Sequence, residues 1–166
     1  MKRVLTALLL LVMCAALFSS AMAEEPAYAT TRSLIDTLNE NGLAFEFAGK
    51  ADTGDEHVIL QNGIDNLEYT FHCFFNENEA VAIVSVLNII AYDEAASADV
   101  LRAVNSLNSS YKYVRFYVEE AEHTVACAMT IILHDEGDAG DVVLDGLFRA
   151  ANILRSAYPR LAPYHR

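Results

Sequence analysis

Apolar residues recur along this chain with two different periods, and each change of period marks an expected border between a helix and a strand. From Thr30 or Thr31 to about Asn41 the apolar residues are spaced as on one side of a helix, and Gly42 is placed to end it. Over residues 43–48 large apolar residues alternate with smaller or polar ones, which predicts a strand. The folded part is therefore expected to begin with a helix followed directly by a strand.

Three further strands are expected before the next helix. Residues 57–61 form the first, and Asn62-Gly63 after it is a strong turn signal. Residues 67–75 alternate again, with large apolar side chains on one face. The strand 80–91 is apolar on both faces, so it is expected to be covered on both sides, by helices on one and by a further helix or a partner subunit on the other.

The second half repeats these patterns in a different order. A second helix begins after Asp93 or Ser97 and ends near residue 108. Strands at 113–119 and 125–133 follow, joined by a tight acidic turn. These links are of hairpin length, which favours antiparallel pairing.

The chain is expected to end in a third amphipathic helix. It runs from residue 142 to about 158, and Pro159 is placed to stop it. Its apolar stripe includes Phe148, as the stripe of the second helix includes Leu101. Both side chains are therefore expected to be buried.

The order α-β-β-β-β-α-β-β-α predicts an α+β fold, an antiparallel sheet with helices packed on it. Residues 30–162 are long enough for one domain of this kind. They follow a short lead at 24–29, which is expected to be disordered, and precede a tail at 163–166.

The first 23 residues have the three parts of a cleavable secretory signal. Lys2 and Arg3 precede an apolar run of about 15 residues, which is shorter than the roughly 20 needed to span a membrane. An Ala21-Met22-Ala23 cleavage motif follows. The chain is thus expected to be exported to the periplasm or the medium, with no stable membrane insertion after cleavage.

The mature chain is strongly acidic. The precursor carries a net charge of −12. The signal holds two of its eleven basic residues and no acid, so cleavage leaves nine basic against 23 acidic residues, a net charge of −14. Such a surface repels nucleic acid, which is bound through Lys and Arg. It permits cations or basic peptides as partners.

Cys73 and Cys127 are the cysteines that remain after cleavage. Both fall on strand faces shared with large apolar residues, and burial raises the pKa of a thiol and hides it, so both are expected to be inert packing residues. A disulfide between Cys73 and Cys127 is the alternative. It requires their Cα atoms to lie within about 7 Å.

The sequence lacks a catalytic constellation. None of the five histidines shows the helical spacing with a glutamate that a zinc hydrolase uses. No Gly-x-Ser-x-Gly motif is present, and neither mature cysteine has a neighbouring base in sequence. No catalytic residue or cofactor is expected. An unrecognised hydrolase would need a deep pocket that brings a histidine next to a serine, cysteine or acid.

An acidic segment before the last helix is the candidate for calcium binding. Asp135, Glu136, Asp138 and Asp141 place four carboxylates within seven residues, and calcium prefers several oxygen ligands on a flexible loop. The spacing is not that of an EF-hand, and acids at this place also interact favourably with the positive end of a helix. No metal site is therefore assigned, and an acidic calcium-binding envelope protein remains the alternative function.

Aromatic residues on one expected strand form a candidate binding surface. Tyr111, Tyr113 and Tyr117 alternate along it, with Arg115 among them. Tyrosine is frequent at protein interfaces because it offers apolar area together with a polar group. The same pattern also fits the half-exposed face of an edge strand.

Several segments of the second half carry packing and turn patterns rather than chemistry. They are the helix end Val104-Asn105-Ser106-Leu107-Asn108, the strand Val114-Arg115-Phe116-Tyr117-Val118, the acidic turn into 125–133, and Ala157-Tyr158-Pro159-Arg160-Leu161. With these, the chain from about Thr31 to Leu161 resembles the YbjN family, whose fold is similar to that of the dimeric type III secretion chaperones. The resemblance implies a fold and a chaperone-like role, and it implies no catalytic residue.

The expected function is therefore binding without catalysis. An exported domain with a doubly apolar strand, a tyrosine face and a chaperone-like resemblance is expected to bind another polypeptide, or a second copy of itself as a homodimer. The sheet and the second helix are the surfaces expected to make the contact.

Overall fold

The structure is a computed structural model that describes residues 25–64, 67–134 and 137–166. Within these residues, six strands form one antiparallel sheet in the order β1-β2-β3-β4-β6-β5. The strands are β1 (Glu46–Lys50), β2 (Glu56–Ile64), β3 (Leu67–Phe75), β4 (Val81–Ala91), β5 (Arg115–Glu119) and β6 (Thr124–Ile132). The helices are α2 (Ala29–Glu40), α3 (Ser97–Ser110) and α4 (Ala139–Leu161), with short 3-10 turns at Glu94–Ala96 and Ala162–Tyr164. The predicted α+β class and element order are confirmed.

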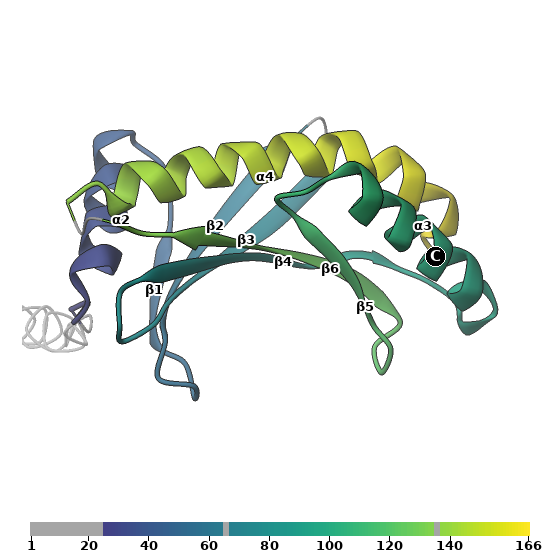
Figure 1. Ribbon diagram of the computed structural model, residues 1–166, viewed down its shortest axis with the longest axis horizontal. Coiled ribbons are helices and arrows are strands. Elements are labelled where there is room, and N and C mark those ends of the chain that lie inside the picture. The colour runs from purple at the N-terminus through teal and green to yellow at the C-terminus, as the bar shows by residue number, and fades with distance from the viewer. Residues whose placement is uncertain (1–24, 65–66, 135–136) are drawn as a thin grey trace, which may run out of the picture.

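The helices gather on one side of the sheet (Figure 1). Helix α4 lies along the sheet, α2 packs against α4 at one end, and α3 packs against β5 and α4 at the other. The sheet arches beneath α4, and the β1–β2 and β5–β6 hairpins descend at its two ends. The face turned away from α4 is therefore concave, and no helix of the described residues covers it.

Alternation along the strands builds the core on the helix side. Val58, Cys73, Val84 and Met129 face one another in register across β2, β3, β4 and β6, and all are buried. Successive strand residues point to opposite faces, so each buried row alternates with a row on the concave face. One face of the sheet therefore forms the core with the helices, and in the described residues the other face is turned toward solvent.

Strand β4 is covered on one side only. Ala82, Val84 and Val86 are buried beneath the helices, whereas Ile83 and Leu87 on the opposite face are 39% and 44% exposed. Within the described residues, the predicted cover on both sides of this strand is therefore found on one side alone. The uncovered apolar side chains lie on the concave face.

The prediction of a hairpin turn at Asn62-Gly63 is wrong. Strand β2 continues through both residues to Ile64, and Asn62 pairs with Tyr69 in β3. The connection therefore falls at 65–66, which lie outside the described residues. Helix α2 ends at Glu40, just before Gly42, whose φ of 64° suits glycine, but the strand after it begins only at Glu46.

Two predictions about the helices are wrong in detail. Pro159 does not stop α4, which runs two residues further to Leu161. Proline lacks the N–H that would bond the carbonyl four residues back, and near a helix end that bond is cheaply lost. Phe148 and Leu101 are 53% and 44% exposed, because each lies at the margin of its stripe.

The two ends of the domain are held by hydrogen bonds. In the lead, Glu56 of β2 is 1% exposed and accepts hydrogen bonds from the backbone N–H groups of Ala27 (2.5 Å) and Tyr28 (3.2 Å). In the tail, the Arg166 N–H donates to the carbonyl of Ala91 at 3.0 Å. The lead from residue 25 and the tail are therefore ordered parts of the domain, contrary to the expectation for the lead.

Candidate functional site

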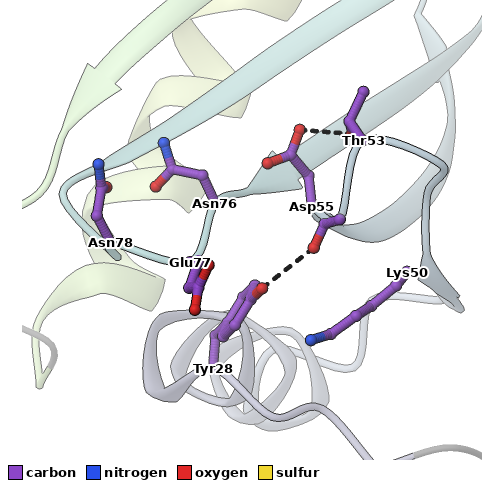
Figure 2. A pocket seen from close by; sticks show the side chains of 8 residues that line it. Tyr28, Lys50, Thr53, Asp55, Asn76, Glu77 and Asn78 are labelled. Atoms are coloured by element: carbon purple, nitrogen blue, oxygen red, sulfur yellow. Dashed lines mark hydrogen bonds between the residues drawn. The ribbon is translucent and has the colours of Figure 1, made fainter.

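A shallow pocket lies where the β1–β2 loop, the β3–β4 turn and the start of α2 meet (Figure 2). Its volume is about 610 Å³. The residues that line it are Tyr28, Lys50, Thr53, Gly54, Asp55, Asn76, Glu77 and Asn78. This feature is called the loop pocket below.

Most of the side chains that line the loop pocket carry polar groups. The Tyr28 hydroxyl donates to the Gly54 carbonyl at 3.1 Å, and the Lys50 Nζ lies 4.7 Å from the centre of the Tyr28 ring. The Asn76 Oδ1 is buried with no hydrogen-bond partner. These groups can hydrogen-bond a small polar molecule. The lining contains no Ser, Cys or His that would pair a nucleophile with a base.

The concave sheet face offers a larger and more apolar surface. In one row, His57, Phe74, Ile83 and Thr130 lie side by side across β2, β3, β4 and β6. In the next row, Ile59, His72, Ser85 and Ala128 do so. Leu87 and Ile132 extend the apolar part along β4 and β6, and Ile132 is 64% exposed.

Two histidines meet near the middle of β2 and β3 on this face. His57 Nε2 and His72 Nδ1 lie 3.0 Å apart, so one ring nitrogen donates a hydrogen bond and the other accepts it. The Phe74 ring stacks on His57 with 4.3 Å between ring centres. Burial lowers the pKa of both imidazoles from their ordinary value of 6.5, and for His57 the neighbouring His72 lowers it further. The pair is therefore held in the neutral form at pH 7.

Acidic side chains border the concave face. Glu46 on β1 and Glu68 on β3 are exposed, and Glu119 on β5 is half-buried. Arg115 on β5 is the cation that the register places on the described part of this face. The apolar centre is thus surrounded by a mainly negative rim.

The structure does not form the predicted tyrosine face. Strand β5 begins only at Arg115, so Arg115 and Tyr117 share the concave face. Tyr113 lies in the preceding loop and is 74% exposed. Tyr111 follows the end of α3 and packs toward Phe116 on the helix side, with 6.3 Å between ring centres.

The two mature cysteines are free and buried. Cys73 lies on β3 and Cys127 on β6, with β4 between them. Neighbouring strands are spaced by about 4.8 Å, and Cys73 pairs with Val84 whereas Cys127 pairs with Val86, so the two Cα atoms lie more than about 9 Å apart, too far for the alternative of a disulfide. Burial raises the pKa of each thiol to about 12. Neither thiol is therefore available for chemistry.

The acidic segment before α4 is only partly described. Asp135 and Glu136 lie outside the described residues. Asp138 flanks the first turn of α4, and Asp141 lies within that turn and accepts a hydrogen bond from the Thr37 hydroxyl at 3.5 Å. Within residues 25–64, 67–134 and 137–166, no three His, Cys, Asp or Glu side chains converge as a metal cluster. Asp138 and Asp141 are placed to interact favourably with the positive N-terminal end of the α4 dipole.

The histidine pair was not predicted from the sequence, because the turn between β2 and β3 was predicted at Asn62-Gly63. A turn at Asn62-Gly63 would set His57 opposite Glu68, whereas the actual register sets it opposite Phe74 and places His72 opposite Ile59. Only this register makes the two histidines diagonal neighbours. The signal that could have revealed them is the length of the alternating pattern in β3.

None of the helices in the described part of the chain combines the length and apolar character needed to cross a membrane.

Comparison with known proteins identifies a family and a fold. The family model YbjN, described as "Putative bacterial sensory transduction regulator", matches residues 32–158. A crystal structure of YbjN from E. coli, described as "a putative transcription regulator", is similar to this chain with a TM-score of 0.54 and 11% identity. The match covers 79% of this chain and 93% of that one. At this identity the likeness shows the fold alone. No curated protein matches the chain.

Proposed function

The chain belongs to the YbjN family, and we propose that it is an exported, non-enzymatic binding protein whose concave sheet face docks another polypeptide. The family description as a regulator fits a protein that acts by binding. The observation that carries the proposal is the set of aliphatic side chains left in water on that face, Ile83, Leu87 and Ile132. Burying one such side chain fully contributes about 1.5–3 kcal/mol, so a partner that covers them gains affinity.

The shape of the face favours a helix as the docked element. The sheet already packs α4 on its other side, and helix on sheet is a standard way to bury an apolar sheet face. The concave side between the two descending hairpins presents apolar rows that the stripe of an amphipathic helix can cover (Figure 1).

The charge of the face and of the whole chain favours a basic partner over a second copy. Glu46, Glu68 and Glu119 border the apolar centre, against Arg115 on the same face. Two mature copies that each carry a net charge of −14 repel one another, whereas lysines flanking an apolar stripe are attracted to this rim. The proposed occupant is therefore an amphipathic helix with basic flanks.

The described residues support a role without catalysis. The cysteine thiols are buried with raised pKa values, and the lining of the loop pocket contains no Ser, Cys or His. Ser85 lies opposite His72 in the register, but it is only 8% exposed. A hydroxyl that is covered in this way is poorly placed to attack an external substrate.

Export is the part of the proposal that rests on residues 1–23, which lie outside the described residues. Their charge, apolar run and Ala-x-Ala motif are those of a cleavable signal. We expect the protein recovered from outside the inner membrane of its host to begin at Glu24. N-terminal sequencing or intact mass measures this directly. A chain that retains Met1 and stays in the cytoplasm would contradict export.

Replacing Leu87 with aspartate should weaken docking at least tenfold. The substitution introduces a carboxylate that the partner would bury where an apolar contact is expected. It also adds a negative charge beside a rim that is already acidic. The probe is a fluorescently labelled synthetic helix with a leucine stripe and flanking lysines, and anisotropy with the chain from residue 24 measures its affinity. A helix of the same stripe with glutamates in place of the lysines should bind much more weakly.

Leu101→Asp is the matched control. Leu101 is also 44% exposed, but it lies on α3 and outside the concave face. It should leave the affinity within about twofold of the original chain. Equal losses in both variants, or no binding of the basic helix, would overturn the proposal. A stable dimer in light scattering that Leu87→Asp dissociates would show instead that the occupant is a second copy.

A further inference from the structure

The two imidazoles on the concave face are spaced as two ligands of one metal ion. His57 Nε2 and His72 Nδ1 are 3.0 Å apart, and their rings are inclined by 25°. They come from neighbouring strands, at diagonal positions of the β2–β3 register. A rigid hairpin therefore fixes their separation, which a loop would leave variable.

We propose that His57 and His72 together bind a divalent transition-metal ion of the copper, nickel and zinc group. Metal–imidazole bonds are about 2.0–2.1 Å long, so two bonds to nitrogens 3.0 Å apart enclose an angle of about 95° at the ion. This angle lies between those of tetragonal copper or nickel sites and tetrahedral zinc sites. The ring that donates the hydrogen bond must move its proton to its other nitrogen, and small rotations of the two rings then direct both lone pairs toward one point above the sheet.

The surroundings suit an ion with imidazole ligands. The Phe74 ring stacks on His57, which limits the orientations of that ring. Glu46 lies close enough to His57 to raise its pKa against the larger effect of burial, so its negative field also attracts a cation. Calcium and magnesium prefer oxygen ligands, so this ligand pair selects against them.

The site supplies two protein ligands. Within the described residues no third His, Cys, Asp or Glu joins the pair as a metal cluster. Water, or a side chain of a docked partner, would fill the other coordination positions. The dissociation constant is therefore expected to be micromolar, as for an exposed two-ligand site. A closed structural site with four protein ligands would bind the ion much more tightly. The proposal stands independently of the docking function.

The protonation state of the pair is favourable for binding. An imidazole must be neutral to ligate a metal, and burial lowers the pKa of both rings below 6.5. At pH 7 neither ring carries an extra proton, so metal binding requires only a change of tautomer in the ring that donates the hydrogen bond. As the pH falls below the lowered values, protons compete and the affinity should drop. The charged groups in the same row of the sheet are Glu46 and Arg115.

Calorimetric titration of the untagged chain from residue 24 with copper, nickel and zinc chloride tests the site. We expect one ion per chain, an affinity that weakens at least tenfold from pH 7.5 to pH 5, and no competition from millimolar calcium. His57→Gln and His72→Gln should each weaken binding at least tenfold. His134→Gln removes an exposed histidine after β6 and should leave binding unchanged.

Electron paramagnetic resonance of the copper-loaded original chain provides a readout that needs no variant. Two coordinated imidazole nitrogens are expected. A spectrum with fewer than two, or binding that survives in both the His57→Gln and the His72→Gln variants, would overturn the proposal. So would binding that His134→Gln abolishes. Circular dichroism of each variant shows whether a loss of metal affinity results from unfolding of the variant.

Discussion

Replacing Gly140 with alanine is expected to lower the free energy of unfolding by about 3 kcal/mol. Gly140 lies in the first turn of α4, where its N–H donates to the Ser33 Oγ of α2 at 2.9 Å. A Cβ at this position would lie closer than 3.0 Å to the Ser33 carbonyl oxygen and the Thr37 Oγ1. The carbonyl is part of the α2 backbone, so the two helices would have to move apart. Urea unfolding followed by circular dichroism measures the loss.

Gly146→Ala in the same helix is the matched control. Its added Cβ would also be crowded, but by the end of the Ile131 side chain, which is only half-buried and can turn aside. Alanine is also favoured over glycine within a helix by about 1 kcal/mol. The two effects should leave the stability within about 1 kcal/mol of the original. Equal stability of the Gly140 and Gly146 variants would show that the close approach of α2 and α4 is wrong.

Replacing Glu56 with alanine should destabilise the fold by about 2–4 kcal/mol. Its carboxylate accepts the backbone N–H groups of Ala27 and Tyr28, just before α2, and Glu79 accepts that of Thr30 at 2.7 Å. No side chain of the N-cap residue, Tyr28, caps the helix. A carboxylate of β2 and one of the β3–β4 turn therefore take this role and meet the positive end of the helix. Without Glu56, one buried and one partly buried backbone donor lose a charged acceptor, and a hydrogen bond of this kind contributes about 1.5–3 kcal/mol.

Thermal and urea unfolding of the Glu56 variant measure this loss, with Glu77→Gln as the control. Glu77 is exposed in the β3–β4 turn, and its substitution should change the midpoint of unfolding little. Hydrogen exchange should also show faster opening of α2 in the Glu56→Ala variant than in the original chain. A variant as stable as the control would contradict the capping role of Glu56.

The order of elements could be predicted because each element carries its own local pattern. The helical stripe around Leu34 and the alternation through Phe71 and Phe75 report burial directly, and both sets of residues are buried in the structure. The end of α2 is also marked locally, because Gly42 readily adopts the positive φ that the chain takes just after the helix. Signals of this kind depend on a few neighbouring residues, so the sequence displays them.

The register and the site could not be predicted because they depend on pairing between segments. Asn62-Gly63 favours a turn locally, but β2 gains further pairs with β3 by extending through it. That shift of register decides which side chains meet on the concave face. The contact of His57 with His72 and the buried capping by Glu56 are both consequences of long-range pairing, and neither has a local motif.

The predicted tyrosine surface failed for a related reason. Alternation at Tyr111, Tyr113 and Tyr117 indicates one strand face, but α3 continues to Ser110 and the strand starts at Arg115. The first two tyrosines therefore belong to a helix end and a loop. The proposed binding surface instead lies on strand β4, for which the sequence predicted two apolar faces and the structure leaves Ile83 and Leu87 exposed.

The central claim, that the concave sheet face is the binding surface, is tested most directly by nuclear magnetic resonance. The ¹⁵N-labelled chain from residue 24 is titrated with the basic amphipathic helix, and the shifted amides are mapped. The largest shifts are predicted in β2, β3, β4 and β6, centred on Ile83 and Leu87. Shifts confined to the loop pocket around Tyr28 or to the outer surface of α4, or no shifts at all, would contradict the claim.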